Sequence, residues 1–97
     1  MKDNPAESRY EVLVDDQLAG LAAYRLSEGT IELTHTEVDD AYEGQGLAGQ
    51  LARAALDAAR GRGLAVLPSC PYMSRFIGKH PEYVDLVPED RRGEFGL

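Results

Sequence analysis

The segment Glu43-Gly44-Gln45-Gly46-Leu47-Ala48-Gly49 decides the fold, because it joins a predicted strand to a predicted helix. Its glycines let the backbone come close to a ligand. The first amides of a helix have no intrahelical partners and lie at the positive end of the helix dipole. The segment therefore predicts a site for an anion such as a pyrophosphate at the start of a helix.

After this turn the apolar residues repeat with the period of a helix. The predicted helix carries an apolar stripe and ends at Gly61-Arg62-Gly63, as glycine favours the position after a helix C-terminus; the stripe is Leu47, Leu51, Ala54, Ala55 and Ala58. The following run, 64–67, is continuously apolar, which is typical of a strand inside a helix-covered sheet.

Before the turn, three segments alternate between two faces, as strands do. They cover residues 9–14, 18–26 and 30–38, and short turns between them predict an antiparallel meander. Strict alternation in the third segment places four side chains on one face, namely Ile31, Leu33, His35 and Glu37.

The C-terminal part begins with Pro68-Ser69-Cys70-Pro71, which ends the short strand. Pro71 suits the first turn of a second helix, so Ser69 or Cys70 is its predicted N-cap. Its buried stripe would be Met73, Phe76 and Ile77, and Pro81 prevents its continuation past His80. Residues 82–87 are predicted to be a final strand or a packed extended segment.

The predicted fold class is α/β, or α+β in some schemes. A mixed sheet has an antiparallel N-terminal meander, then a parallel βαβ crossover, then a short C-terminal helix. We expect one domain over residues 1–97, with flexible ends at 1–8 and 88–97. In a βαβ unit the ligand site lies beyond the carboxyl ends of the parallel strands, which here are 37–38 and 68–70.

Composition narrows the functional classes. The 97 residues are 43% hydrophobic and 28% charged, as in an ordinary globular domain. The first twenty residues lack the apolar core of a secretory signal, and Cys70 has no partner for a disulfide within the chain, so we expect a cytoplasmic protein. The net charge of −7 argues against nucleic acid. It could favour cationic substrates such as amines, or simply aid solubility; a monomer is expected.

The glycine motif has weaker interpretations. Gly44-x-Gly46-x-x-Gly49 fits a dinucleotide fingerprint, but no acidic residue follows at the ribose-binding position. No Gly-Lys-Ser/Thr is present for a P-loop. The turn could also simply pack a helix against a sheet. The spacing of His35, Cys70 and His80 fits no zinc pattern, so no metal is expected.

The segment from Glu37-Val38 to Leu51 resembles the acetyl-coenzyme A motif of the GNAT acyltransferases, Arg/Gln-x-x-Gly-x-Gly/Ala at a helix start. Gly46 and Ala48 match its last two defined positions, and Glu43 departs from the first. Three further segments resemble a compact, single-domain branch of that superfamily: His-Thr-Glu-Val at 35–38, Cys-Pro-Tyr at 70–72 and His-Pro-Glu-Tyr at 80–83. The N-terminal helices of typical members, which help to form the acceptor site, have no counterpart.

The resemblance implies that acetyl-coenzyme A (acetyl-CoA) binds with its pyrophosphate on the turn and its pantetheine arm along Glu37 and Val38. The residues implied at the turn are Gly44, Gln45, Gly46, Leu47, Ala48 and Gly49. Transfer of the acetyl group to an amine needs a base, because a protonated amine cannot attack a thioester. Glu37 and His35 are the candidates by position, and Tyr72 could donate a proton to the leaving thiolate.

Cys70 offers a second mechanism. At a helix N-terminus its thiolate would be stabilised, and it could take the acyl group before passing it on. Alternatively it is a small buried hydrophobic residue, and His35 is equally compatible with simple packing. Two functions therefore remain open: an N-acetyltransferase with an unidentified amine acceptor, or a CoA-binding module without efficient catalysis.

Overall fold

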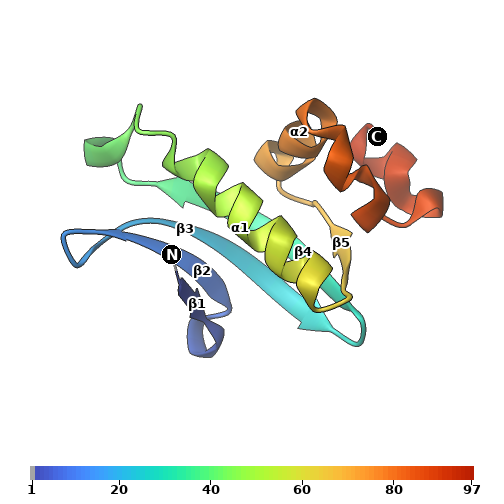
Figure 1. The fold of residues 1–97 in the computed structure, drawn as a ribbon, viewed down its shortest axis with the longest axis horizontal. Coiled ribbons are helices and arrows are strands. Elements are labelled where there is room, and N and C mark those ends of the chain that lie inside the picture. The colour runs from blue at the N-terminus through green and yellow to red at the C-terminus, as the bar shows by residue number, and fades with distance from the viewer. Residues whose placement is uncertain (1) are drawn as a thin grey trace.

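A five-stranded mixed sheet forms the frame of the protein, as a computed structural model describing residues 2–97 shows (Figure 1). The strands lie side by side in sequence order: β1 (Lys2–Asn4), β2 (Arg9–Val14), β3 (Gln17–Ser27), β4 (Thr30–Val38) and β5 (Ala65–Leu67). The first four pair antiparallel, whereas β5 runs parallel to β4. The predicted meander and parallel crossover are confirmed.

Two α-helices accompany the sheet, α1 (Leu47–Gly61) and α2 (Pro71–Lys79). α1 crosses one face of the sheet, and α2 lies beyond β5 near the C-terminus (Figure 1). Short 3-10 helices fill the connections: η1 (Pro5–Glu7), η2 (Asp40–Tyr42), η3 (Pro81–Leu86) and η4 (Glu89–Phe95). Neither α-helix is long and apolar enough to cross a membrane, in the part of the chain that the structure describes.

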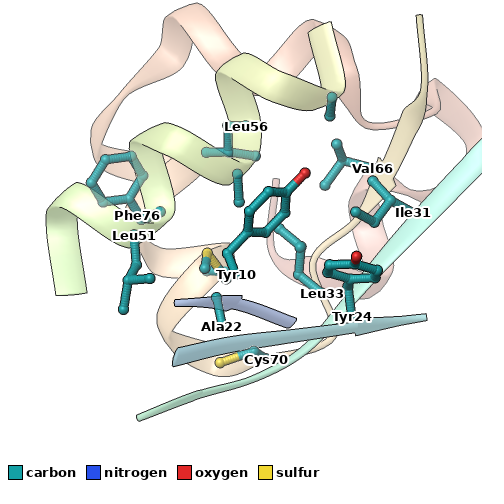
Figure 2. Close-up of a cluster of buried hydrophobic side chains, with 14 of the residues drawn as sticks. Tyr10, Ala22, Tyr24, Ile31, Leu33, Leu51, Leu56, Val66, Cys70 and Phe76 are labelled. Atoms are coloured by element: carbon teal, nitrogen blue, oxygen red, sulfur yellow. The ribbon is translucent and has the colours of Figure 1, made fainter. Parts of the chain in front are cut away.

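The core lies between α1 and the sheet. Leu51 and Leu56 of α1 point toward side chains of the strands, including Tyr10, Ala22 and Leu33 (Figure 2). The buried face of α1 is rich in small residues, which let the helix approach the strands closely; it consists of Leu47, Leu51, Ala52, Ala55, Leu56 and Ala59. At Gly20 of β3 a Cβ would lie 2.9 Å from the carbonyl oxygen of Glu37 and 3.2 Å from Leu51 Cδ1, so a larger residue would push helix and strands apart.

A β-bulge in β4 overturns the predicted facing of its second half. Tyr24 pairs with Leu33 and Ala23 with His35, so Thr34 is an extra residue without a partner in this ladder. Side chains of directly opposed residues share a face. Since Ala22 and Tyr24 both face the core, their partners Thr36 and Leu33 do too, whereas His35 lies on the other side.

The prediction that Ile31, Leu33, His35 and Glu37 share one face is therefore wrong. A one-residue insertion reverses every later side chain in a strand. Ile31 and Leu33 are buried under α1, whereas the His35 and Glu37 side chains are 61% and 65% exposed on the opposite face.

The segment after α2 also differs from its prediction. Residues 82–86 are neither a strand nor extended, because Pro81–Leu86 form the 3-10 helix η3, and only Val87 has an extended backbone. This helix buries Tyr83, whose hydroxyl donates a 2.8 Å hydrogen bond to Asp57 Oδ1 on the outer side of α1. This hydrogen bond holds η3 against α1, and η3 does not extend the sheet.

Both ends of the described chain contain regular structure. Lys2–Asn4 pair with Arg9–Glu11 of β2, and Glu89–Phe95 form η4. Met1 lies outside the described residues. The predicted flexibility of 1–8 and 88–97 stays a prediction, and no pattern in the sequence predicts β1 or η4.

We expect Tyr24→Phe to lower the free energy of unfolding by about 1 kcal/mol, because the phenol of Tyr24 donates a 2.6 Å hydrogen bond to Asp3 Oδ1 and ties β1 to the sheet. Urea unfolding with Asp3→Ala and the double variant tests this. Since all three changes remove the same bond, the two single losses must not add.

The same bond predicts an alkaline limit to stability. Burial, followed by the hydrogen bond to Asp3, raises the pKa of Tyr24 from 10.0 to about 12. The folded state therefore prefers the neutral phenol: this stabilisation is fully present below pH 10 and is lost as the pH rises through about 12. In Tyr24→Phe the decline of stability over that range should be shallower.

Candidate functional site

The glycine turn leaves the start of α1 open. Gly44 and Gly46 have φ values of 83° and 73°, a left-handed conformation that glycine adopts without strain. Gly46 is the N-cap of α1, and no side chain caps the helix. Since the first intrahelical bond runs from the Gln50 amide to the Gly46 carbonyl, the amides of residues 47–49 have no partner within the helix.

A cavity of about 340 Å³ opens at this turn. Its size falls within the usual range for small-molecule sites. Strand β4, the turn, the first residues of α1 and one residue of α2 line it: Val38, Tyr42, Glu43, Gly44, Gly46, Leu47, Ala48, Gly49 and Tyr72. Of the predicted phosphate-binding residues, only Gln45 is absent from this lining.

β4 and β5 separate next to this cavity. Their ladder covers only Thr30–Glu32 and Ala65–Leu67. Beyond it the Ser69 hydroxyl donates a 2.6 Å hydrogen bond to Glu32 Oε2, and the Cys70 amide donates one of 2.9 Å to the Leu33 carbonyl. In the described chain no strand pairs with the 34–38 part of β4 on this side, so its backbone groups are open to an extended ligand.

Cys70 lies where the strands separate, as the N-cap of α2. Its side chain is buried on the core side, and Sγ lies 3.5 Å from Thr36 Oγ1. Burial raises the pKa of the thiol, but the Thr36 hydroxyl and the backbone amides of Met73, Tyr72 and Thr36 together outweigh it, so the pKa lies below its ordinary value. Cys70 does not line the cavity itself.

His35 and Glu37 lie together on the opposite face of the sheet. His35 Nε2 is 3.2 Å from Glu37 Oε2. Glu37 lines a smaller hollow of about 120 Å³ with Asp39 and the 18–21 part of β3. The structure therefore brings the turn, Val38 and Tyr72 together around one cavity. Cys70 is buried outside the lining of that cavity. His35 and Glu37 lie on the opposite face of the sheet.

A sequence model of the GCN5-related N-acetyl-transferase family matches residues 9–86, which is most of the chain. The chain belongs to this family. The match spans β2 to η3 and includes both the glycine turn and the cysteine.

Part of the chain is also similar to curated proteins. The chain is 43% identical over 51 residues to Protein NATD1 of Bos taurus, covering 53% of this chain and 45% of that protein. It is 37% identical over 60 residues to Protein NATD1 of Danio rerio, covering 60% and 54%. In these alignments the chain spans about half the length of its curated relatives.

A solved structure shares the fold of this GCN5-related chain. It is the solution NMR structure of a GCN5-like protein from Staphylococcus aureus, with a TM-score of 0.67 and 25% sequence identity over 84% of this chain and 82% of that one. The predicted membership and fold class are thus confirmed.

Sequence reasoning missed two residues of this site. Tyr42 belongs to no motif in the sequence but lines the cavity. Strict alternation would place Thr36 on the face opposite Leu33, but it faces the core and contacts Cys70. No sequence pattern predicts these two positions. The facing of Thr36 depends on the bulge in β4, and the position of Tyr42 depends on the short helix η2. No group of three or more His, Cys, Asp or Glu that could hold a metal ion occurs within residues 2–97.

We predict that the alkylation rate of Cys70 by iodoacetamide has its pH midpoint below that of a free thiol, because the folded protein stabilises the thiolate. Thr36→Val removes the hydroxyl beside Sγ and should move the midpoint upward. Ser74→Ala is the matched control, because the Ser74 hydroxyl donates its hydrogen bond to the Pro71 carbonyl and not to Cys70. Equal midpoints in Thr36→Val and the parent would contradict this account.

Proposed function

We propose that this protein is an acetyl-CoA-dependent N-acetyltransferase with an amine acceptor. The observation that carries the proposal is the cavity at the uncapped start of α1, next to an unpaired stretch of β4 in a chain of the GCN5-related family. The proposal covers the activity of the protein as a whole, together with a cytoplasmic location and a monomeric state.

In this proposal the pyrophosphate of CoA accepts hydrogen bonds from the amides of the turn. A helix N-terminus favours an anion there through its dipole and its unpaired N–H groups. Glu43 also lines the cavity, so its carboxylate repels the phosphates and the backbone must supply the attraction. Gly44 and Gly46 matter because they aim these amides without adding a side chain.

The pantetheine arm would lie along the 34–38 part of β4. This arm contains two amides, and the strand edge offers N–H and C=O groups at a matching spacing. The arm would run past Val38 and Tyr72 toward the gap beside Cys70, which brings the thioester to the point where β4 and β5 separate.

Acetyl transfer then requires a free amine to attack the thioester carbonyl. The nitrogen forms a bond to the carbonyl carbon, the C–S bond breaks, and the nitrogen loses a proton. Glu37 or His35 is the proposed base, and the hollow between Glu37 and Asp39 suits a cationic amine as it approaches. Tyr72, which lines the donor cavity, is the proposed proton donor to the departing thiolate.

A covalent route through Cys70 is a variant of this mechanism. The thiolate would attack the thioester and release CoA, and the amine would then attack the new thioester and release the cysteine. The lowered pKa and the helix N-terminus favour this route. The 5% exposure of Cys70 opposes it, because the thiol must become accessible to react.

A CoA-binding module without efficient catalysis is the second candidate. It is favoured by the high exposure of His35 and Glu37, which leaves both candidate bases in water. Desolvation normally strengthens the groups of an active site.

The donor site is tested by a matched pair of glycine variants. Gly46 and Gly29 have the same φ of +73° and nothing within 4 Å of an added Cβ, but Gly29 lies in the β3–β4 turn. Gly46→Ala and Gly29→Ala should each lose about 1 kcal/mol of stability. Only Gly46→Ala should weaken CoA binding, by about tenfold, in isothermal titration calorimetry. Equal CoA affinities in the two variants would place the phosphates elsewhere.

The chemistry is tested by intact mass spectrometry with acetyl-CoA, followed by acetyl-CoA consumption across a panel of amines. A stable increase by one acetyl group that is absent in Cys70→Ala supports the covalent route. Direct transfer instead predicts activity in Cys70→Ala, and a loss of about a hundredfold in Glu37→Gln with unchanged CoA affinity. CoA binding without acetyl consumption would favour the binding module.

A further inference from the structure

A second hollow adjoins the donor cavity on the surface of α2. Its volume is about 220 Å³, and residues of one helical stripe line it: Tyr72, Arg75, Phe76, Lys79 and His80. Tyr72 belongs to both cavities. Gly49 of the donor site is also close, since a Cβ there would lie 3.9 Å from the Tyr72 hydroxyl and 4.0 Å from Phe76 Cε2.

The charge of this hollow is opposite to that of the chain. The protein has 17 acidic and 10 basic residues, yet the lining contains Arg75 and Lys79 and no carboxylate. Both cations are exposed, and neither forms an ion pair with any residue among 2–97. By contrast, Arg60 on α1 is bound by Asp85, and Arg53 contacts Tyr83. Two unpaired cations one helical turn apart fit a ligand with a compact negative charge.

The hollow also has an aromatic wall. The ring of His80 stacks on Phe76, with centroids 4.0 Å apart and planes at 18°, and His80 Nδ1 lies 2.9 Å from the Phe76 carbonyl oxygen. Tyr72 lies beside Phe76, with centroids 6.3 Å apart. Phe76 itself is buried, so the rings of Tyr72 and His80 are the partly exposed ones. Such rings beside cations are suited to a purine that bears a phosphate.

We propose that this hollow binds the adenosine 3′-phosphate end of CoA, with Arg75 and Lys79 on the 3′-phosphate and the rings of Tyr72 and His80, which pack on the buried Phe76, against the purine. The inference rests on the proposed function, because it follows the ligand from the glycine turn onto α2. It provides the anionic ligand with positively charged side chains, which the turn itself lacks. The consequence is selectivity: the chain should distinguish CoA from dephospho-CoA, which lacks only the 3′-phosphate.

The test compares the two ligands by isothermal titration calorimetry. The parent protein should bind CoA at least about tenfold more tightly than dephospho-CoA, as expected for charge-assisted hydrogen bonds to one phosphate. In Arg75→Gln/Lys79→Gln the ratio of the two dissociation constants should fall to about one, mainly through weaker CoA binding. Adenosine 3′,5′-bisphosphate should compete with CoA more strongly than ADP does, and only in the parent.

Arg25→Gln is the matched control. It removes one positive charge from an exposed side chain of β3 whose partner is Glu32, 3.7 Å away, and it should leave the ratio unchanged. Because Arg75 and Lys79 are exposed, circular dichroism should show that the double variant keeps its fold.

Three results would overturn the inference. The parent could bind both ligands equally, the double variant could weaken both by the same factor, or Arg25→Gln could lower the ratio as much as the double variant. In each case CoA binding by the parent would still support the proposed function. If the parent bound neither ligand, the proposed function would fail and the inference with it.

Discussion

The packing of α1 against one face of the sheet is the constraint on which the rest of the structure depends. Its buried face is mostly leucine and alanine, and Gly20 of β3 allows the strands to come close beneath Leu51. A helix bound over this face must return the chain to the sheet beside β4, so β5 runs parallel to it. The same packing fixes the start of α1 beside the end of β4, where the glycine turn lies. The core and the candidate site thus share one cause.

The parts of the fold that the sequence predicts are those governed by a repeating pattern. The helix over 47–61 and the meander with its short turns each follow from period or from turn chemistry. The place of the candidate site follows in the same way, since the glycine turn lies near the carboxyl end of β4. The family resemblance added acetyl-CoA as the proposed ligand, which no periodicity contains.

What the sequence could not predict depends on single residues and on distant contacts. The extra residue Thr34 in β4 leaves no mark in the hydrophobic pattern, yet it moves His35 and Glu37 to the opposite face. Likewise, residues 82–87 are apolar enough for a strand, but Pro81–Leu86 form a 3-10 helix that the hydrogen bond of Tyr83 to Asp57 holds against α1. Arg75 and Lys79 become candidate ligand-binding residues only because α2 lies beside the turn.

Because of the bulge at Thr34, the two faces of β4 carry different groups of candidate site residues. Under the proposed function, the acyl donor lies on the α1 side of β4 and the amine approaches from the side of His35 and Glu37. Neither substrate then stands in the path of the other, so they can bind in either order and meet at the strand edge. Steady-state kinetics would be sequential in that case, with both substrates present before any product leaves. Only an acetylated Cys70 would change the pattern to ping-pong, because CoA would depart before the amine reacts.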